Sequence, residues 1–95
     1  MIYNKSIRNP SGLLLALFEA QGGECFHCGI AMSREDGPDG WSREHVVPIS
    51  TGGSGMRRNV VLAHWRCNNS RGAEPPTDDM LERHDALYEV IREAS

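Results

Sequence analysis

The chain has 95 residues, a length that suits one small domain and excludes a large multi-domain protein. Chains this short bury only about 60–65% of their unfolded surface, so disulfides, a metal or a partner subunit usually help to stabilise them. Three cysteines cannot form a closed set of disulfides, and a net charge of −3 excludes a uniformly basic nucleic-acid binder.

A helix is expected first, over residues 10–21. Asn9 has the polar side chain of a helix cap, and Pro10 suits the first turn of a helix. The leucines and the phenylalanine of GLLLALF recur on one face, which indicates a helix packed on a core. Gly22 and Gly23 follow and are expected to end it.

The middle of the chain predicts a turn, two strands and a second helix. The segment ECFHCG, residues 24–29, has the form of a tight metal-binding turn. WSREHVVPI, residues 41–49, and NVVLA, residues 59–63, are rich in β-branched residues and predict strands. A helix is expected to start near His64 and to stop close to Gly72.

A last helix is expected over residues 77–93, with Thr77 as its cap and acidic residues in its first turn. Its apolar stripe predicts a core-facing side made by Met80, His84, Leu87 and Ile91. Strands and helices in this mixture predict a small α+β domain.

The charges are distributed unevenly. Residues 43–72 carry a net charge of +4, whereas residues 1–42 carry −2 and residues 73–95 carry −5. A solvated surface is the simplest interpretation of such a run. All five basic residues are arginines, however, and a guanidinium suits phosphate contacts. We therefore predict nucleic-acid contacts from this segment, made by Arg57, Arg58, Arg66 and Arg71.

Two pairs of residues have the spacing of a zinc site. Cys25 and Cys28 form one pair, and His64 and Cys67 form the other at the same separation. Structural zinc is held tetrahedrally by cysteine and histidine, often as two such pairs from distant segments. His27 is a rival ligand, but its place inside the turn should point it away from the ion. The alternative is a core histidine beside three free thiols.

Further residues between and after the two pairs complete a recognisable pattern. EHVVP occupies residues 44–48, Gly52-Gly53 follows, Asn59 comes next, and Asn68 directly follows the second pair. In this order the chain resembles the HNH endonuclease family, the zinc-knuckle branch of the ββα-metal nucleases, over residues 23–72. The resemblance implies a ββα-metal core with a structural zinc knuckle, flanked by the two outer helices.

The resemblance also implies roles for individual residues. His45 would be the general base, since histidine exchanges protons near neutral pH. Asn59 would hydrogen-bond to the His45 imidazole and fix it. Glu44 and Asn68 would hold a catalytic Mg²⁺ or Mn²⁺ through oxygen atoms. Cleavage of a phosphodiester would leave 5′-phosphate and 3′-hydroxyl ends.

The chain departs from the family pattern in three places. His64 replaces a more frequent cysteine, Glu44 replaces a commoner aspartate, and Asn68 replaces histidine, so the triad is His-Asn-Asn. Taken singly, each position also has a plain structural interpretation. Glu44 alone is a solvated strand residue, Asn59 a turn residue and Asn68 a helix cap. Trp41 and Trp65 are expected to pack rather than to stack on bases.

The leading hypothesis is a single domain, residues 1–95, that acts as a DNA endonuclease of low sequence specificity, as a monomer or weak dimer. The alternatives are an RNA-directed nuclease and a non-catalytic zinc-knuckle module that binds nucleic acid or protein. Small members of the family resemble phage proteins, which implies phage packaging proteins as partners. The first ten residues lack a secretory apolar run and no segment suits a membrane span, so we expect a cytoplasmic protein.

Overall fold

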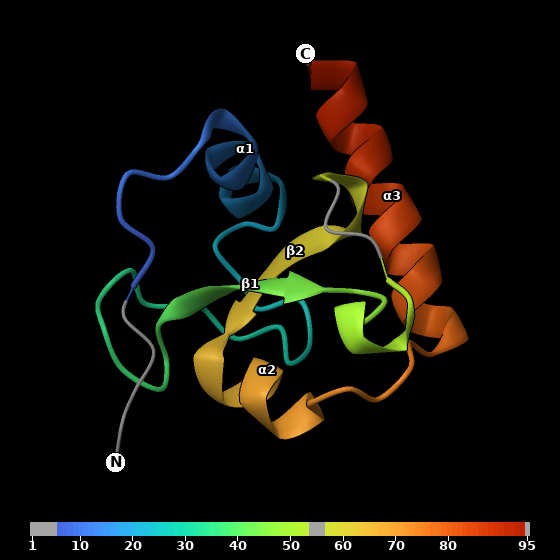
Figure 1. Cartoon of the computed structure of the whole chain (residues 1–95). Coiled ribbons are helices and arrows are strands. Elements are labelled where there is room, and N and C mark those ends of the chain that lie inside the picture. The colour runs from blue at the N-terminus through green and yellow to red at the C-terminus, as the bar shows by residue number, and fades with distance from the viewer. Residues whose placement is uncertain (1–5, 54–56, 95) are drawn as a thin grey trace.

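The computed structural model describes residues 6–53 and 57–94, and Figure 1 shows the arrangement of its elements. Two short strands form an antiparallel sheet, and helices pack around it. No helix among these residues is long and apolar enough to cross a membrane. In chain order the elements are α1 (Gly12–Ala20), β1 (Trp41–His45), β2 (Val60–His64), α2 (Trp65–Arg71) and α3 (Asp78–Ala94), with 3₁₀ turns at Ile49–Thr51 and Arg57–Asn59.

Helix α1 begins two residues later than its sequence predicts. Ser11 is the cap, because its Oγ accepts a hydrogen bond from the Leu14 amide at 3.3 Å. Asn9 instead has a positive φ of 48°, so the expected Asn9 cap is wrong. Gly22 and Gly23 follow the helix with φ values of 65° and 72°, which confirms the predicted glycine stop.

The two strands pair with Trp41 opposite His64 and with His45 opposite Val60. Successive side chains of β1 therefore face opposite sides of the sheet. Trp41 packs edge-on against Phe18 of α1 with the ring centroids 5.3 Å apart, whereas Ser42 faces α2. The sheet thus lies between α1 on one side and α2 on the other (Figure 1).

Strand β1 is four residues shorter than the predicted strand over 41–49. The Val46 amide still donates to the Asn59 carbonyl oxygen at 2.8 Å. At Val47 the Asn59 side chain replaces the neighbouring backbone: its Oδ1 accepts from the Val47 amide, and its Nδ2 donates to the Val47 carbonyl, both at 2.9 Å. The side chain thereby ends the ladder, and β2 likewise starts at Val60 rather than Asn59.

The outer edge of β2 is covered by polar groups from the first helix and the turn after it. The Gln21 side chain accepts from the Leu62 amide at 2.9 Å and donates to the Leu62 carbonyl at 2.8 Å. The Phe26 amide donates to the same carbonyl at 3.0 Å. These bonds pair the Leu62 amide and carbonyl, which would otherwise be unpaired at the edge of the sheet. They also hold the turn at residues 25–28 beside β2.

Helix α3 follows the prediction closely. The Thr77 Oγ1 accepts from the Met80 amide at 3.1 Å, which confirms the cap. Met80 is buried, and Leu87 and Ile91 pack on the core, as their spacing predicts. Tyr88 was not expected inside, yet it is buried and its hydroxyl donates to the Val60 carbonyl. The hydroxyl therefore meets an acceptor at the start of β2, which makes burial of Tyr88 favourable.

The second glycine of the Gly52-Gly53 pair is required by close packing. A Cβ atom at Gly53 would lie 1.8 Å from the Val47 carbonyl oxygen and 2.8 Å from that of Pro48. The Gly53 amide also donates to the Pro48 carbonyl at 2.9 Å. The loop after β1 can fold back this tightly only without a side chain.

We therefore expect Gly53→Ala to lower the free energy of unfolding by about 1–3 kcal/mol, because the backbone must move to admit the methyl group. Gly12→Ala is the matched control, since a Cβ at Gly12 meets no atom within 4 Å and alanine favours a helix. Urea denaturation of both zinc-loaded variants measures the difference. Equal stability of the two variants would show that the loop admits the methyl group at position 53 without losing stability.

Candidate metal centre and active site

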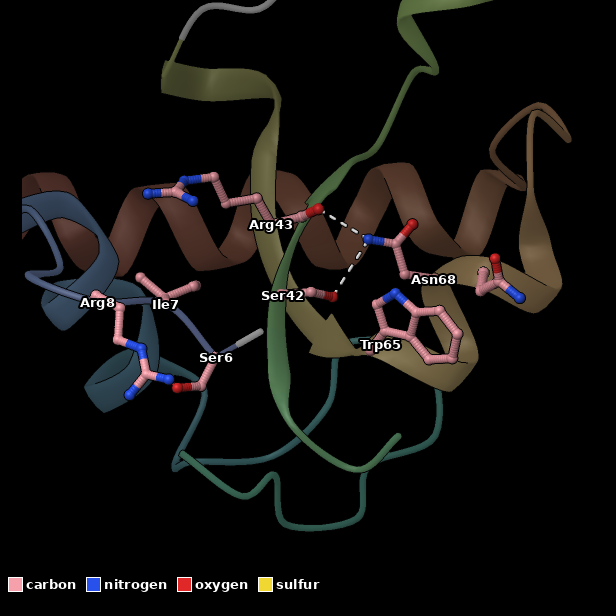
Figure 2. Close-up of a pocket in the computed structure, with 8 residues that line it drawn as sticks. Ser6, Ile7, Arg8, Ser42, Arg43, Trp65 and Asn68 are labelled. Atoms are coloured by element: carbon pink, nitrogen blue, oxygen red, sulfur yellow. Dashed lines mark hydrogen bonds between the residues drawn. The ribbon is translucent and has the colours of Figure 1, made fainter. Parts of the chain in front are cut away.

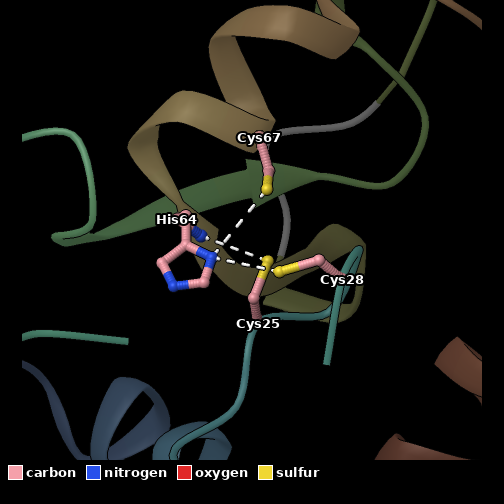
Figure 3. Close-up of side chains that lie close together, drawn as sticks. All are labelled: Cys25, Cys28, His64 and Cys67. Atoms are coloured by element: carbon pink, nitrogen blue, oxygen red, sulfur yellow. Dashed lines mark hydrogen bonds between the residues drawn. The ribbon is translucent and has the colours of Figure 1, made fainter. Parts of the chain in front are cut away.

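Four side chains from two distant segments meet where β2 passes into α2. Cys25 and Cys28 come from the turn after α1, His64 ends β2, and Cys67 lies in the first turn of α2. Their ligand atoms all lie within 4.8 Å of one another, and no other group of three or more such residues occurs in the described part of the chain. Figure 3 shows the four side chains converging on one point. The predicted set is thus assembled.

The His64 ring presents one defined nitrogen to the sulfur atoms. Its Nε2 lies 2.9 Å from the Ala31 carbonyl oxygen, to which it donates. Nδ1 is then the unprotonated nitrogen, and it lies 3.3 Å from the Cys28 sulfur and 3.8 Å from the Cys67 sulfur (Figure 3). A carbonyl that fixes the tautomer in this way is typical of histidines that bind metal ions.

Backbone donors hold the buried Cys25 sulfur in place. It accepts from the His27 amide at 3.4 Å and from the His64 amide at 3.3 Å. Amide donors of this kind stabilise a thiolate, which is the form that binds a metal. The His64 amide comes from the end of β2, so one sulfur already joins the two ligand-bearing segments.

The two remaining thiols respond differently to their surroundings. Burial opposes ionisation of Cys28, but hydrogen bonds from the Ile30 backbone and the neighbouring ligand side chains lower its pKa to about 7. Burial, followed by the charge of Cys25, raises the pKa of Cys67 to about 12. Cys67 therefore does not ionise at neutral pH by itself. A dication at the centre favours the fully ionised set.

The donor set fits zinc. Zinc bond lengths of about 2.3 Å to sulfur and about 2.0 Å to nitrogen place neighbouring ligand atoms roughly 3.5–3.8 Å apart in a tetrahedron. The His64 Nδ1 contacts of 3.3 Å and 3.8 Å are close to this spacing. Four protein ligands fill a tetrahedron and leave no open position for a substrate. Such a centre is structural rather than catalytic.

Glu44 is buried, so it is not the solvated strand residue that its type alone indicates. Its side chain is 5% exposed on the α2 side of the sheet. His27 Nε2 lies 2.7 Å from Oε2, and Arg71 Nη1 lies 3.5 Å from Oε1. His27 thus points away from the sulfur cluster, as its place in the turn predicts. Its partnership with Glu44 had no signal in the sequence.

His45 ends β1 with a half-buried side chain and a firmly held backbone. Arg71 Nη1 donates to the His45 carbonyl at 2.9 Å, and Arg71 Nη2 donates to the next carbonyl, that of Val46. Asn59 secures the two residues beyond His45 through its main chain and its side chain. Within the described residues the His45 imidazole itself has no hydrogen-bond partner. The ring is available to accept a proton.

Asn68 lies in α2, opposite β1. Its Nδ2 donates to the Arg43 carbonyl oxygen at 2.8 Å and to the Ser42 hydroxyl at 3.3 Å. Figure 2 shows the amide nitrogen turned to the strand and the oxygen turned away from it. The Asn68 side-chain oxygen, Oδ1, accepts no hydrogen bond from the described residues, and Asn68 is one of the residues that line a polar pocket of about 390 Å³. An oxygen atom so placed can bind a hard cation.

The arginines of the basic segment have different surroundings. Arg58 is exposed, and Arg66 is half exposed in an ion pair of 2.7 Å with Asp39. Arg71 is 9% exposed and donates to backbone carbonyls, so its predicted phosphate contact would need those bonds to open. The Arg57 side chain lies outside the described part of the structure.

These features together define a class of protein. An antiparallel strand pair leading directly into a short helix, tied by a Cys₃His centre to an earlier turn, forms a ββα unit with a zinc knuckle. The sequence model of the HNH endonuclease family matches residues 25–74, just over half of the chain. The chain therefore belongs to the HNH endonuclease family. No curated protein and no solved structure matches it.

Proposed function

We propose that the chain is a metal-dependent DNA endonuclease that hydrolyses phosphodiester bonds with His45 as general base. The free His45 imidazole carries this proposal. His27 bonds to Glu44, His64 lies among the cysteines, and the His84 ring bonds to the Arg58 carbonyl. Among the described histidines, only His45 has both a main chain held by hydrogen bonds and an imidazole without a hydrogen-bond partner.

The chemistry assigned to His45 is simple. One ring nitrogen takes a proton from a water molecule as the water oxygen attacks phosphorus. The bond from phosphorus to the 3′ oxygen breaks, and the departing 3′ oxygen takes a proton from solvent, which leaves a 5′-phosphate and a 3′-hydroxyl. The bonds from Arg71 and Asn59 hold the main chain from which the imidazole projects. Positioning of this kind lowers the entropic cost of the reaction.

Glu44 and Asn68 are the proposed ligands of a catalytic Mg²⁺ or Mn²⁺. Both offer oxygen atoms, and the Asn68 oxygen is turned away from its strand contacts. A divalent cation held by them would neutralise charge on the phosphate and stabilise the leaving 3′ oxygen. Two protein ligands suit Mg²⁺, which keeps several water or phosphate oxygens in its coordination sphere.

The substrate is proposed to be DNA of low sequence specificity. Arg58 on the turn before β2, together with Arg57 and Arg66, supplies positive charge for phosphate contacts. One ββα unit offers one catalytic histidine, so a monomer is expected to cut one strand at a time. Packaging proteins of a phage remain a prediction drawn from the resemblance alone.

Nicking of supercoiled plasmid by the zinc-loaded protein tests the proposal. With Mg²⁺ or Mn²⁺ we expect conversion to the open circular form, and EDTA should stop it. Religation of the product by DNA ligase without prior kinase treatment checks for 5′-phosphate ends. A protein that shifts DNA in a gel but never cuts it with either ion would instead be a non-catalytic binding module.

A further inference from the structure

The Glu44 carboxylate is buried and therefore depends on its partners. At 5% exposure it has lost most of its water, and a buried carboxylate needs donors or cations in compensation. The His27 Nε2 contact of 2.7 Å to Oε2 has hydrogen-bond length. The Arg71 Nη1 contact of 3.5 Å to Oε1 is longer than an ordinary N–H···O bond. His27 is the closer of the two partners.

Arg71 is committed to other acceptors. Its Nη1 donates to the His45 carbonyl at 2.9 Å, and its Nη2 donates to the carbonyls of Val46 and Glu74. These bonds tie the end of α2 to the end of β1. Arg71 thus contributes positive charge near Glu44, while the direction of the carboxylate is set by the hydrogen bond from His27.

The position of His27 is set in turn by the zinc-binding turn. His27 lies between Cys25 and Cys28, and its amide donates to the Cys25 sulfur at 3.4 Å. The preceding residue, Phe26, donates its amide to the Leu62 carbonyl at 3.0 Å and holds the turn on β2. The imidazole therefore projects from a segment that is fixed by the metal ligands on both sides of it.

We propose that His27 is the positioning residue of the catalytic carboxylate and couples the zinc knuckle to the binding of the catalytic cation. When Glu44 is ionised, its oxygens only accept, so His27 Nε2 carries the hydrogen and occupies Oε2. Oε1 makes no contact of hydrogen-bond length, since Arg71 Nη1 lies 3.5 Å from it, and it is the oxygen that we assign to a divalent cation. This inference rests on the proposed function, because it assigns Glu44 to that cation.

Two amide substitutions separate this role from packing. In His27→Gln the side-chain nitrogen reaches about as far as Nε2 and can still donate to Glu44. In His27→Asn the same amide is one methylene shorter and cannot reach. Phe26→Leu is the packing control, because it removes a buried ring that packs edge-on against His27, with the ring centroids 5.7 Å apart, but keeps the His27 donor itself. Each full-length variant is loaded with zinc, its zinc content is measured, and Mn²⁺ is titrated by calorimetry.

We expect His27→Asn to weaken Mn²⁺ binding about 10–100-fold, the usual loss when a hydrogen-bond partner of a metal ligand is removed. His27→Gln should bind Mn²⁺ nearly as tightly as the wild type, and Phe26→Leu should lose stability but not Mn²⁺ affinity. Zinc content should stay constant in all four proteins. Nicking should follow the Mn²⁺ affinities, so that excess Mn²⁺ restores His27→Asn.

Equal Mn²⁺ affinity in His27→Asn and the wild type would overturn the positioning role, and so would an equal loss in both amide variants. If the wild type nicks DNA in either case, the proposed function stands and only the inference about His27 fails. A wild-type protein that neither binds Mn²⁺ nor nicks DNA would overturn both.

Discussion

His45→Ala is expected to reduce plasmid nicking by roughly 10²–10⁴-fold, the usual contribution of a general base. The other three histidine rings are engaged with Glu44, with the cysteine cluster and with the Arg58 carbonyl. None of them is free to take the proton from the attacking water. Initial nicking rates at saturating Mg²⁺ or Mn²⁺ measure the loss.

The same variant should keep its zinc and its circular dichroism spectrum, because the hydrogen bonds that join His45 to its neighbours come from its backbone. Added imidazole should restore part of the activity, which a purely structural defect would not allow. His45→Gln and His84→Gln form a matched pair. His84→Gln, the control, should nick at the wild-type rate, whereas His45→Gln should lose activity as His45→Ala does. A folded, zinc-loaded His45→Ala protein that cuts as fast as the wild type would exclude His45 as the base.

Cys67→Ser is expected to abolish zinc binding and cooperative folding. Structural zinc sites in small peptides bind with apparent free energies of about 10–16 kcal/mol, whereas whole domains are stable by only about 5–15 kcal/mol. Loss of the ion therefore removes a binding free energy that is comparable with the whole free energy of unfolding of a domain. The site joins α2 to the turn after α1, so both should loosen together. Zinc content and thermal melting by circular dichroism measure the effect.

Two further variants sharpen this test. Ser70→Ala changes an exposed residue of the same helix and should melt like the wild type with one zinc per chain. Cys67→His offers another zinc ligand and should retain more zinc than Cys67→Ser. Chelation of zinc from the wild type should reproduce the Cys67→Ser spectrum. Cys67→Ser that melts at the wild-type temperature, or a folded wild type without zinc, would contradict a structural zinc site.

The sequence by itself determined the parts of the protein that depend on spacing along the chain. Two ligand pairs with the same separation identified the Cys₃His set, because a short turn can bring both members of a pair to one ion. The apolar period and Thr77 identified α3, because both act within a few residues. The ordered motif around Glu44 and His45 identified the family, which the match over residues 25–74 confirms.

Predictions from neighbouring residues were wrong where two residues suited the same helix cap, and where the hydrogen-bond partner of a strand residue lay far away in the sequence. Asn9 and Ser11 both suit a helix cap. The first turn of α1 starts at Gly12, so Ser11 is the cap. Strand propensity predicted a strand through Ile49, but the side chain of Asn59, twelve positions after Val47, takes the hydrogen bonds of Val47 and ends β1 earlier. The predicted bond from Asn59 to the His45 imidazole remains a prediction.

Only the tertiary structure decided which partners the buried polar groups of the site have. Glu44 meets His27, seventeen positions earlier, and Arg71 turns inward to the carbonyls of His45 and Val46. A buried charge takes whichever donor the packing brings within about 3 Å, and that choice leaves no trace in composition or periodicity. Spacing therefore predicted the four candidate metal ligands, whereas the surroundings of the Glu44 carboxylate depend on how the turn at residues 25–28 packs against the sheet.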